Sequence, residues 1–285
     1  MKLICTPPVI DAMIKRVCDR KLSPRQFKAH FGPSKYVSGI AFDMMVREAK
    51  KKTPPDIVKL EEYLMALYWL KNYKREEVCA VFFRVTEKTF RGKYKRILPY
   101  LSSIHVIDFE SRHTRSNFGY VAKVSIDGTD CPIWEPFPFS PRWFTHKWKG
   151  PGIRYEIGLC IETGWIVWVN GGYPCGQWND LQISRDGILN LLGEDEKVIA
   201  DSGYRGDRRI LHKTGENRSY TARVRSEVCS RHETVNSRIK AYSVASTKFR
   251  HNLDMHTQCI YSVVNLVQLE IRHESPLFQV VYIEA

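Results

Sequence analysis

The sequence lacks several features that would place it in other classes of protein. No run approaches the roughly 18 uninterrupted apolar residues of a membrane-spanning helix. The first residues contain no apolar core of about 7 to 15 residues before a small-residue cleavage site. Low-complexity stretches are missing, and 43% of the 285 residues are hydrophobic, as in ordinary packed domains. We therefore expect a soluble intracellular protein of one large or two modest domains.

The eight cysteines are not spaced as metal ligands. They form no Cys-x-x-Cys pair and have no close histidine partner, which argues against a zinc finger or zinc ribbon. Without a secretion signal they are expected to be reduced and mostly buried.

Positive charge is concentrated in the N-terminal part of the chain. The formal net charge is +13; residues 1–116 carry 24 basic and 12 acidic side chains, and residues 117–285 carry 20 and 19. A basic module beside a near-neutral one is typical of a protein that grips a polyanion, usually a nucleic acid. The alternative is a basic surface that only keeps the protein soluble.

Residues 1–116 have a helical pattern. Ile57–Leu70 is apolar almost all round, which predicts a buried helix. Lys74–Phe82 and Thr86–Leu98 predict two helices joined by a tight turn, with Thr86 as N-cap and Pro99 ending the second helix. This pattern indicates a helix-turn-helix on double-stranded DNA, and its alternative is a plain helical hairpin with a solvated basic face. The expected contacts are Lys88, Thr89 and Arg91 near base edges and Lys93, Lys95 and Arg96 near phosphates.

Beyond residue 116 the pattern changes to that of an α/β domain. The expected strands are Tyr120–Asp127, Arg154–Glu162, Trp165–Gly171, Lys197–Asp201 and a fifth around Ser219–Arg225. The expected helices are Asp180–Leu192, Ser226–Tyr242 and Met255–Arg272.

Three acidic residues stand out by position. Asp127 and Asp201 end two predicted strands, and Glu233 lies within a predicted helix. If the two strands are parallel neighbours, their ends lie about 5 Å apart. The carboxylates could then share divalent cations that activate a nucleophile and stabilise the leaving oxygen of a phosphodiester, work that suits Mg²⁺. Each acid alone also fits an ordinary turn or a solvated helix, and spacing does not exclude Asp130, Asp180, Asp186 or Asp207.

Basic and aromatic residues alternate in the segment after the first strand of this domain. The pattern predicts either a DNA-facing loop or a packed aromatic cluster. Its members are Arg142, Lys147, Lys149 and Arg154, with Trp143, Phe144 and Trp148 between them.

The ordered motifs Ile126–Thr129, Tyr155–Gly158, Asn179–Asp180, Ala200–Tyr204 and Arg231–Lys240 together resemble a DDE-superfamily endonuclease domain of the PIF/Harbinger-like transposase group. The resemblance covers most of residues 57–272. It implies an α/β fold: an RNase H-like catalytic domain, a mixed sheet with helices, over residues 117–285, preceded by an all-helical helix-turn-helix module over 1–116. It also implies two Mg²⁺ or Mn²⁺ ions.

Carried over residue by residue, the resemblance makes Asp127, Asp201 and Glu233 the catalytic, metal-binding acids and Asp180 a supporting acid. Asn236 and Lys240 share the helix face of Glu233 and would touch the substrate phosphate. A related insertion-sequence pattern has a Tyr and an Arg before this Glu, where the chain has Ser226 and Cys229. Arg231 would stand in as the DNA-gripping arginine.

The expected function is therefore that of a DNA transposase, an endonuclease and strand transferase that cuts transposon ends and joins them to target DNA. One alternative is a transposase-derived DNA-binding protein without catalysis, against which the presence of all three acids argues. Another is a cellular metal-dependent nuclease, which would cut without joining. The resemblance and the basic run Lys50–Lys52 suggest the nucleus. The resemblance also suggests a homodimer and a separate Myb-like DNA-binding partner.

Overall fold

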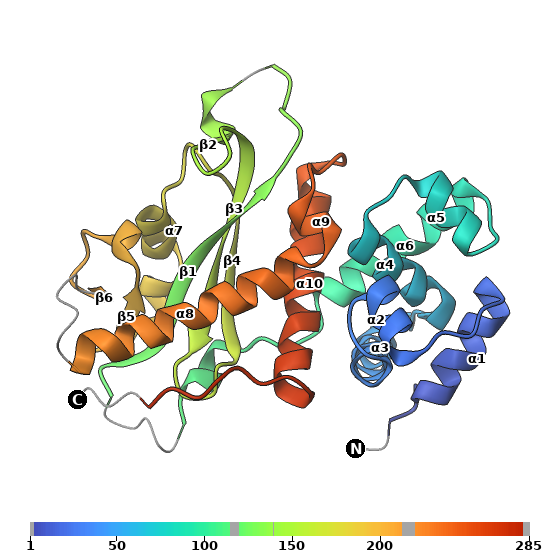
Figure 1. Ribbon diagram of the computed structural model, residues 1–285, viewed down its shortest axis with the longest axis horizontal. Coiled ribbons are helices and arrows are strands. Elements are labelled where there is room, and N and C mark those ends of the chain that lie inside the picture. The colour runs from blue at the N-terminus through green and yellow to red at the C-terminus, as the bar shows by residue number, and fades with distance from the viewer. Residues whose placement is uncertain (1–2, 115–119, 139, 213–219, 282–285) are drawn as a thin grey trace. The chain divides into compact units, whose positions relative to one another are not determined.

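The computed structural model describes residues 3–114, 120–138, 140–212 and 220–281, which form two compact units (Figure 1). One unit comprises residues 1–106, 239–247 and 254–273, and the other comprises 107–238, 248–253 and 274–285. The C-terminal part of the chain thus returns to the first unit, whereas the sequence suggested a single boundary after residue 116. No described helix is both long and apolar enough to span a membrane. Seven of the eight cysteines are buried, as predicted.

The first unit is helical. Tyr63 to Leu70, in its central helix, are all buried, which confirms the predicted buried helix. Trp69 of that helix stacks on Tyr94 with 4.3 Å between ring centroids. The helices are α1 (Pro7–Cys18), α2 (Pro24–Phe31), α3 (Lys35–Lys50), α4 (Leu60–Asn72), α5 (Glu76–Phe82), α6 (Glu87–Ser102), α9 (Ser243–Ser246) and α10 (Leu253–His273).

Helices α5 and α6 form the expected helix pair. Thr86 caps α6, because its side chain accepts a hydrogen bond from the Thr89 backbone N–H at 3.2 Å. Pro99 does not end this helix, in contrast to the prediction. Tertiary contacts hold the last turn together: Leu101 is buried, and Asn265 of α10 donates to the carbonyls of Leu101 and Ser102 at 3.0 and 3.2 Å.

The second unit is built on a six-stranded sheet. Its strands are β1 (Ala122–Pro132), β2 (Phe144–Thr145), β3 (Gly150–Cys160), β4 (Ile166–Pro174), β5 (Lys197–Ala200) and β6 (Ile210–His212). Its two longer helices are α7 (Asp180–Asp186) and α8 (Tyr220–Lys240), and α8 crosses the sheet (Figure 1). Short 3₁₀ turns occupy Phe109–Arg112, Pro141–Trp143, Ile188–Leu191 and Ser202–Tyr204.

The sheet is mixed, as the predicted fold class requires. Its strand order is β2-β3-β1-β5-β6, with β4 also paired to β3. Strands β1, β3 and β4 form an antiparallel meander, and β5 and β6 run parallel to β1. This arrangement is consistent with an RNase H-like fold. The pairing of Ser125 with Ile199 confirms that the two acid-bearing strands are parallel neighbours.

Several predicted elements differ from the structure. The helix predicted from Ile57 begins at Leu60, and the strand predicted over Tyr120–Asp127 runs from Ala122 to Pro132. The helix expected over Asp180–Leu192 ends at Asp186, since Gly187 leaves helical geometry against Asn170, where a Cβ would lie 2.6 Å from the amide nitrogen. The strand expected around Ser219–Arg225 is wrong from residue 220 onward, where the chain is helical; Ser219 itself lies outside the described residues. Val224 and Val228, four residues apart, bury one helix face against the sheet.

The alternation of side chains along β1 sets the position of the site. Val124 and Ile126 pack into the cluster on one face of the sheet, together with Ile188 and Leu189. The residues between and after them point to the opposite face, toward α8. Asp127 is one of these residues, so it lies between the sheet and α8.

Candidate active site

Asp127 and Asp201 come together at one edge of the sheet. The prediction that Asp127 ends its strand is wrong, because β1 continues to Pro132 through its pairing with β3. The parallel pairing of β1 with β5 still brings Asp127 beside Asp201, which directly follows β5. Burial raises the pKa of Asp127 to about 6, and the negative charge of Asp201 adds to this rise. Asp201 is exposed, and its Oδ1 accepts a hydrogen bond from the Gly203 N–H at 2.8 Å. The two carboxylates are therefore electrostatic neighbours with different access to solvent.

Helix α8 docks on β1 through two polar contacts. His232 Nε2 lies 3.0 Å from Ser125 Oγ, and Asn236 Nδ2 donates to Asp127 Oδ2 at 2.9 Å. Residues four apart on a helix thus meet residues two apart on a strand.

Glu233 is exposed, three residues before Asn236. Within the described parts of the chain, no three His, Cys, Asp or Glu side chains are grouped to hold a metal ion. The structure therefore joins two of the three predicted acids, and leaves Glu233 outside that pair.

Asp180, the predicted supporting acid, lies at the start of α7 beside this pair. Asn179 caps the helix by accepting from the Gln182 N–H at 2.8 Å. The Oδ1 atom of Asp180 is buried without a hydrogen bond, 3.4 Å from Arg154 Nη1. Burial raises the pKa of Asp180, although the charge of Arg154 opposes the rise. A Cβ at Gly128 would clash with this Oδ1, so the glycine makes room for the acid.

Two further polar residues form the floor of the site, and sequence reasoning assigned no role to either. Glu156 is 1% exposed and accepts hydrogen bonds from Trp168 Nε1 at 3.0 Å and from Ser184 Oγ. Burial raises the pKa of Glu156 to about 7, although these two hydrogen bonds lower it. The hydroxyl of Tyr204 is buried without a partner, and burial, followed by the charges of Glu156 and Asp180, raises the Tyr204 pKa well above its usual value. Both residues belong to the sequence motifs that carry the family resemblance. Only the strand register shows that they lie together beside the acids.

The competing carboxylates have other partners. Asp130 accepts from Arg154 Nε and Nη2 at 2.6 and 2.9 Å. Burial opposes its ionisation, but the Arg154 hydrogen bonds and nearby charges keep the Asp130 pKa below the usual value. Hydrogen bonds from Arg209 and, more weakly, Arg185 lower the pKa of Asp207 to about 2. Asp186 is exposed at the end of α7. Ion pairing thus accounts for two of these acids without any role in metal binding.

Lys147 lies next to the acids. Its Nζ is 3.5 Å from the Gly128 carbonyl oxygen and 3.7 Å from Asp130 Oδ2, and its charge works against the raised pKa of Asp127. Lys149, two residues later, is exposed with a left-handed backbone φ of 52°. In the loop segment predicted to face DNA, Lys147 therefore lies at the acids, while Lys149 and Arg142 are exposed to solvent.

Arg231 and Arg154 are not on the surface, in contrast to the predictions for both. Arg231 is 1% exposed, and it donates to the carbonyls of Phe278 and Ile161 at 2.9 and 2.5 Å. Arg154 is 9% exposed and paired with Asp130. A buried guanidinium needs such acceptors, so both arginines hold the fold together rather than face DNA.

The basic residues of α6 fall into two groups. Lys88, Thr89 and Lys95 are exposed. The others contact acidic residues of the same unit: Arg91 pairs with Glu76 and Glu87, Lys93 with Glu61 at 2.5 Å, and Arg96 with Glu62 and, at 3.3 Å, Asp56. At the end of α8, Lys240 donates to the Ala245 carbonyl at 3.0 Å.

Comparison with known proteins identifies the family of the chain. The model of the DDE superfamily endonuclease family matches residues 126–268, half of the chain, and this range includes Asp127, Asp201 and Glu233. No curated protein matches the chain. A protein chain in the crystal structure of a pre-cleavage Mos1 transpososome is 9% identical, over 96% of this chain and 98% of that one, with a TM-score of 0.20, too low to show a shared fold. On the family match, the chain belongs to the DDE superfamily endonucleases.

Proposed function

We propose that the chain is a DNA transposase of the PIF/Harbinger-like group, a metal-dependent endonuclease and strand transferase that cuts transposon ends and joins them to target DNA. The observation that carries the proposal is the pair Asp127 and Asp201 at one sheet edge, with Asn236 of α8 bonded to Asp127. Two adjacent carboxylates repel each other unless a cation or proton lies between them. A site that keeps both suits cation-dependent phosphodiester chemistry.

The donor set suits two Mg²⁺ or Mn²⁺ ions. Asp127 and Asp201 offer hard oxygen ligands, and the buried Oδ1 of Asp180 has no hydrogen bond. Asp127, Asp201 and Glu233 are the proposed catalytic residues and metal ligands, with Asp180 in support. Bound ions would activate a water or a 3′-hydroxyl and stabilise the leaving oxygen.

The protein's own groups orient these acids. The Asn236 amide fixes one oxygen of Asp127, and the Gly203 N–H fixes one oxygen of Asp201. Glu233 lies one helical turn before Asn236, so a modest movement of its exposed side chain would bring it toward the pair.

We propose double-stranded DNA as the substrate. Lys88, Thr89 and Lys95 on α6 are exposed for phosphate and base contacts, and Lys147 and Lys149 would hold the strand near the acids. Arg91, Lys93 and Arg96 would contact DNA only by exchanging their acidic partners for phosphates. Because a transposase must join two transposon ends, we propose that it acts as a homodimer. The proposed place of action is the nucleus, with or without a separate Myb-like DNA-binding partner.

The first experiment is nicking of supercoiled plasmid by the purified protein with Mg²⁺, Mn²⁺ or EDTA. We expect cutting that needs metal, vanishes in Asp201→Asn and persists in Asp186→Asn, an exposed acid at the end of α7. Strand transfer from pre-cut ends then separates a transposase from a nuclease that only cuts. If the wild type binds DNA but neither cuts the plasmid nor joins pre-cut ends, the chain is a DNA-binding protein and the proposal is wrong.

A further inference from the structure

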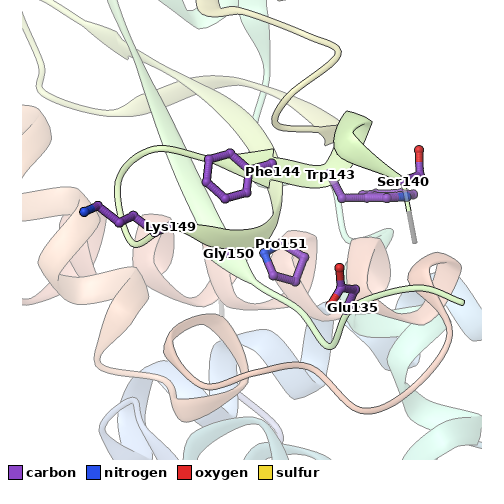
Figure 2. A pocket seen from close by; sticks show the side chains of 7 residues that line it. All are labelled: Glu135, Ser140, Trp143, Phe144, Lys149, Gly150 and Pro151. Carbon is purple, nitrogen blue, oxygen red and sulfur yellow. The ribbon is translucent and has the colours of Figure 1, made fainter. Parts of the chain in front are cut away.

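The hairpin that carries Lys147 also carries a hollow that the proposed catalysis does not use. Figure 2 shows Phe144 and Trp143 on one side of this hollow and Pro151 and Glu135 on the other. Its volume is about 220 Å³. That exceeds the roughly 30 Å³ of a water molecule but falls below the approximately 300 to 1,000 Å³ of pockets for drug-sized ligands. The hollow therefore suits one flat ring system.

The two faces of β2 separate the hollow from the acids. Adjacent residues of a strand point to opposite sides. Thr145 is 3% exposed and donates to Asp130 Oδ2 at 3.0 Å, on the side away from the hollow. Phe144 is 37% exposed and lines the hollow. Lys147 near the acids and Phe144 at the hollow therefore belong to the same hairpin.

The side chains around the hollow define the chemistry of its occupant. Phe144 offers an exposed aromatic ring, while Trp143 is 6% exposed and forms a firm wall. Lys149 lies at one end of the hollow, and its side chain extends away from the other lining residues, where it can meet a phosphate outside the hollow. Glu135 is exposed, and a carboxylate accepts hydrogen bonds from ring or exocyclic N–H groups but repels phosphate. This combination fits a nucleobase against the aromatic wall, with its phosphate toward the lysines.

Packing contacts support the framework around the hollow. The Trp148 ring packs over Gly152, where a Cβ would lie 2.7 Å from the ring, and its Nε1 donates to the Pro151 carbonyl at 3.4 Å. The Arg142 guanidinium lies 5.0 Å from the centroid of the Trp143 ring. The structure thus settles part of the choice between a DNA-facing loop and an aromatic cluster: Trp143 packs inward, and Phe144 remains available.

We propose that this hollow binds one unpaired nucleobase of the DNA strand held at the acidic pair. A base can enter only when it is out of the duplex, so the hollow would favour frayed, nicked or single-stranded ends over intact duplex. The inference rests on the proposed function for its substrate, but it concerns binding and not cleavage.

The test is fluorescence of 2-aminopurine placed at an unpaired or a paired position in otherwise identical oligonucleotides, titrated with the full chain in EDTA. We expect quenching at the unpaired position. Phe144→Ala should weaken that binding about ten- to a hundredfold, because it removes the stacking surface. Phe144→Leu, which keeps apolar bulk, should fold as the wild type does and still bind weakly.

Two controls make the result specific. Lys149→Asn removes the charge while Asn tolerates the left-handed backbone, so it should weaken binding without unfolding the loop. Phe137→Ala removes a fully exposed ring outside the hollow and should change nothing. Equal quenching at both positions, or equal loss in Phe144→Ala and Phe137→Ala, would overturn the proposal. Asp201→Asn should abolish nicking and leave quenching intact, which separates failure of this site from failure of the proposed catalysis.

Discussion

The Asn236 side-chain amide donates a 2.9 Å hydrogen bond to Oδ2 of Asp127, across 109 residues of sequence. This contact ties the helix that carries Glu233 to the strand that carries the first acid. It also favours the ionised form of Asp127, since an amide N–H stabilises a carboxylate. Asn236 therefore positions one acid and the helix of another.

Asn236→Ala should reduce metal-dependent nicking about tenfold and weaken Mn²⁺ binding, because a hydrogen bond to a charged group contributes about 1.5 to 3 kcal/mol. Nicking rates and Mn²⁺ titration calorimetry measure the two effects. Ser237→Ala, at an exposed position next along the helix, is the matched control and should behave as wild type. Equal activity of the two variants would show that Asn236 does not position Asp127 for metal binding or nicking.

Asp127→Asn should stabilise the metal-free protein while it abolishes nicking. The substitution removes a largely buried charge, and relief of its desolvation and of the weaker repulsion from Asp201 is together worth about 1 to 2 kcal/mol. Urea unfolding in EDTA measures the gain. Mn²⁺ should stabilise the wild type and not the variant, because only a folded site with both acids binds it. If the variant is less stable than the wild type in EDTA, the charge of Asp127 does not destabilise the metal-free protein and the prediction is wrong.

The paired carboxylates were predictable from sequence, and their surroundings were not. Asp127 and Asp201 each end an apolar run, so strand pattern and the parallel pairing rule suffice to bring them together. Glu156 and Tyr204 reach the site only through strand register and a short 3₁₀ turn, which local patterns do not encode. Arg231 was misassigned because a basic residue in a helix is usually exposed, and only the tertiary fold supplies the carbonyls that bury it.

Lys95 and Arg96 are neighbours on α6 that should respond differently to alanine. Lys95 is exposed, so Lys95→Ala should leave stability within about 0.5 kcal/mol and reduce the salt dependence of DNA binding by about one phosphate contact. Arg96 pairs with Glu62, which is 6% exposed, so Arg96→Ala should destabilise the protein by about 2 kcal/mol. Thermal unfolding and binding at several salt concentrations distinguish the two. Equal loss of stability in both variants would contradict this division.

His256 should make the protein sensitive to acid. Burial, followed by the charge of Lys240, lowers its pKa to about 3 from a usual value of 6.5. The unfolded chain therefore binds a proton that the folded chain excludes, and stability is lost as the pH falls from 6.5 toward 3, by about 1.4 kcal/mol per pH unit. His256→Gln should lessen the decline between pH 6.5 and 5. Urea unfolding of both proteins at pH 7, 6 and 5 measures it, and parallel curves would exclude His256 as the cause.

Gly128 should be the glycine on which the site depends most, because a Cβ there would clash with Asp180 Oδ1. Gly128→Ala should destabilise the protein by about 1 to 3 kcal/mol, as overpacking does, and lower nicking by displacing the acid. Asp180→Ser should recover part of the stability of Gly128→Ala, because the shorter side chain removes the clash, and a double-mutant cycle measures that coupling.

Gly92→Ala is the opposite control. No atom outside the helix backbone lies within 4 Å of a Cβ at this position in the middle of α6, so alanine should stabilise the helix by about 0.5 to 1 kcal/mol. If Gly128→Ala is as well tolerated as Gly92→Ala, Asp180 does not occupy the space between β1 and α7 that this account of the site requires.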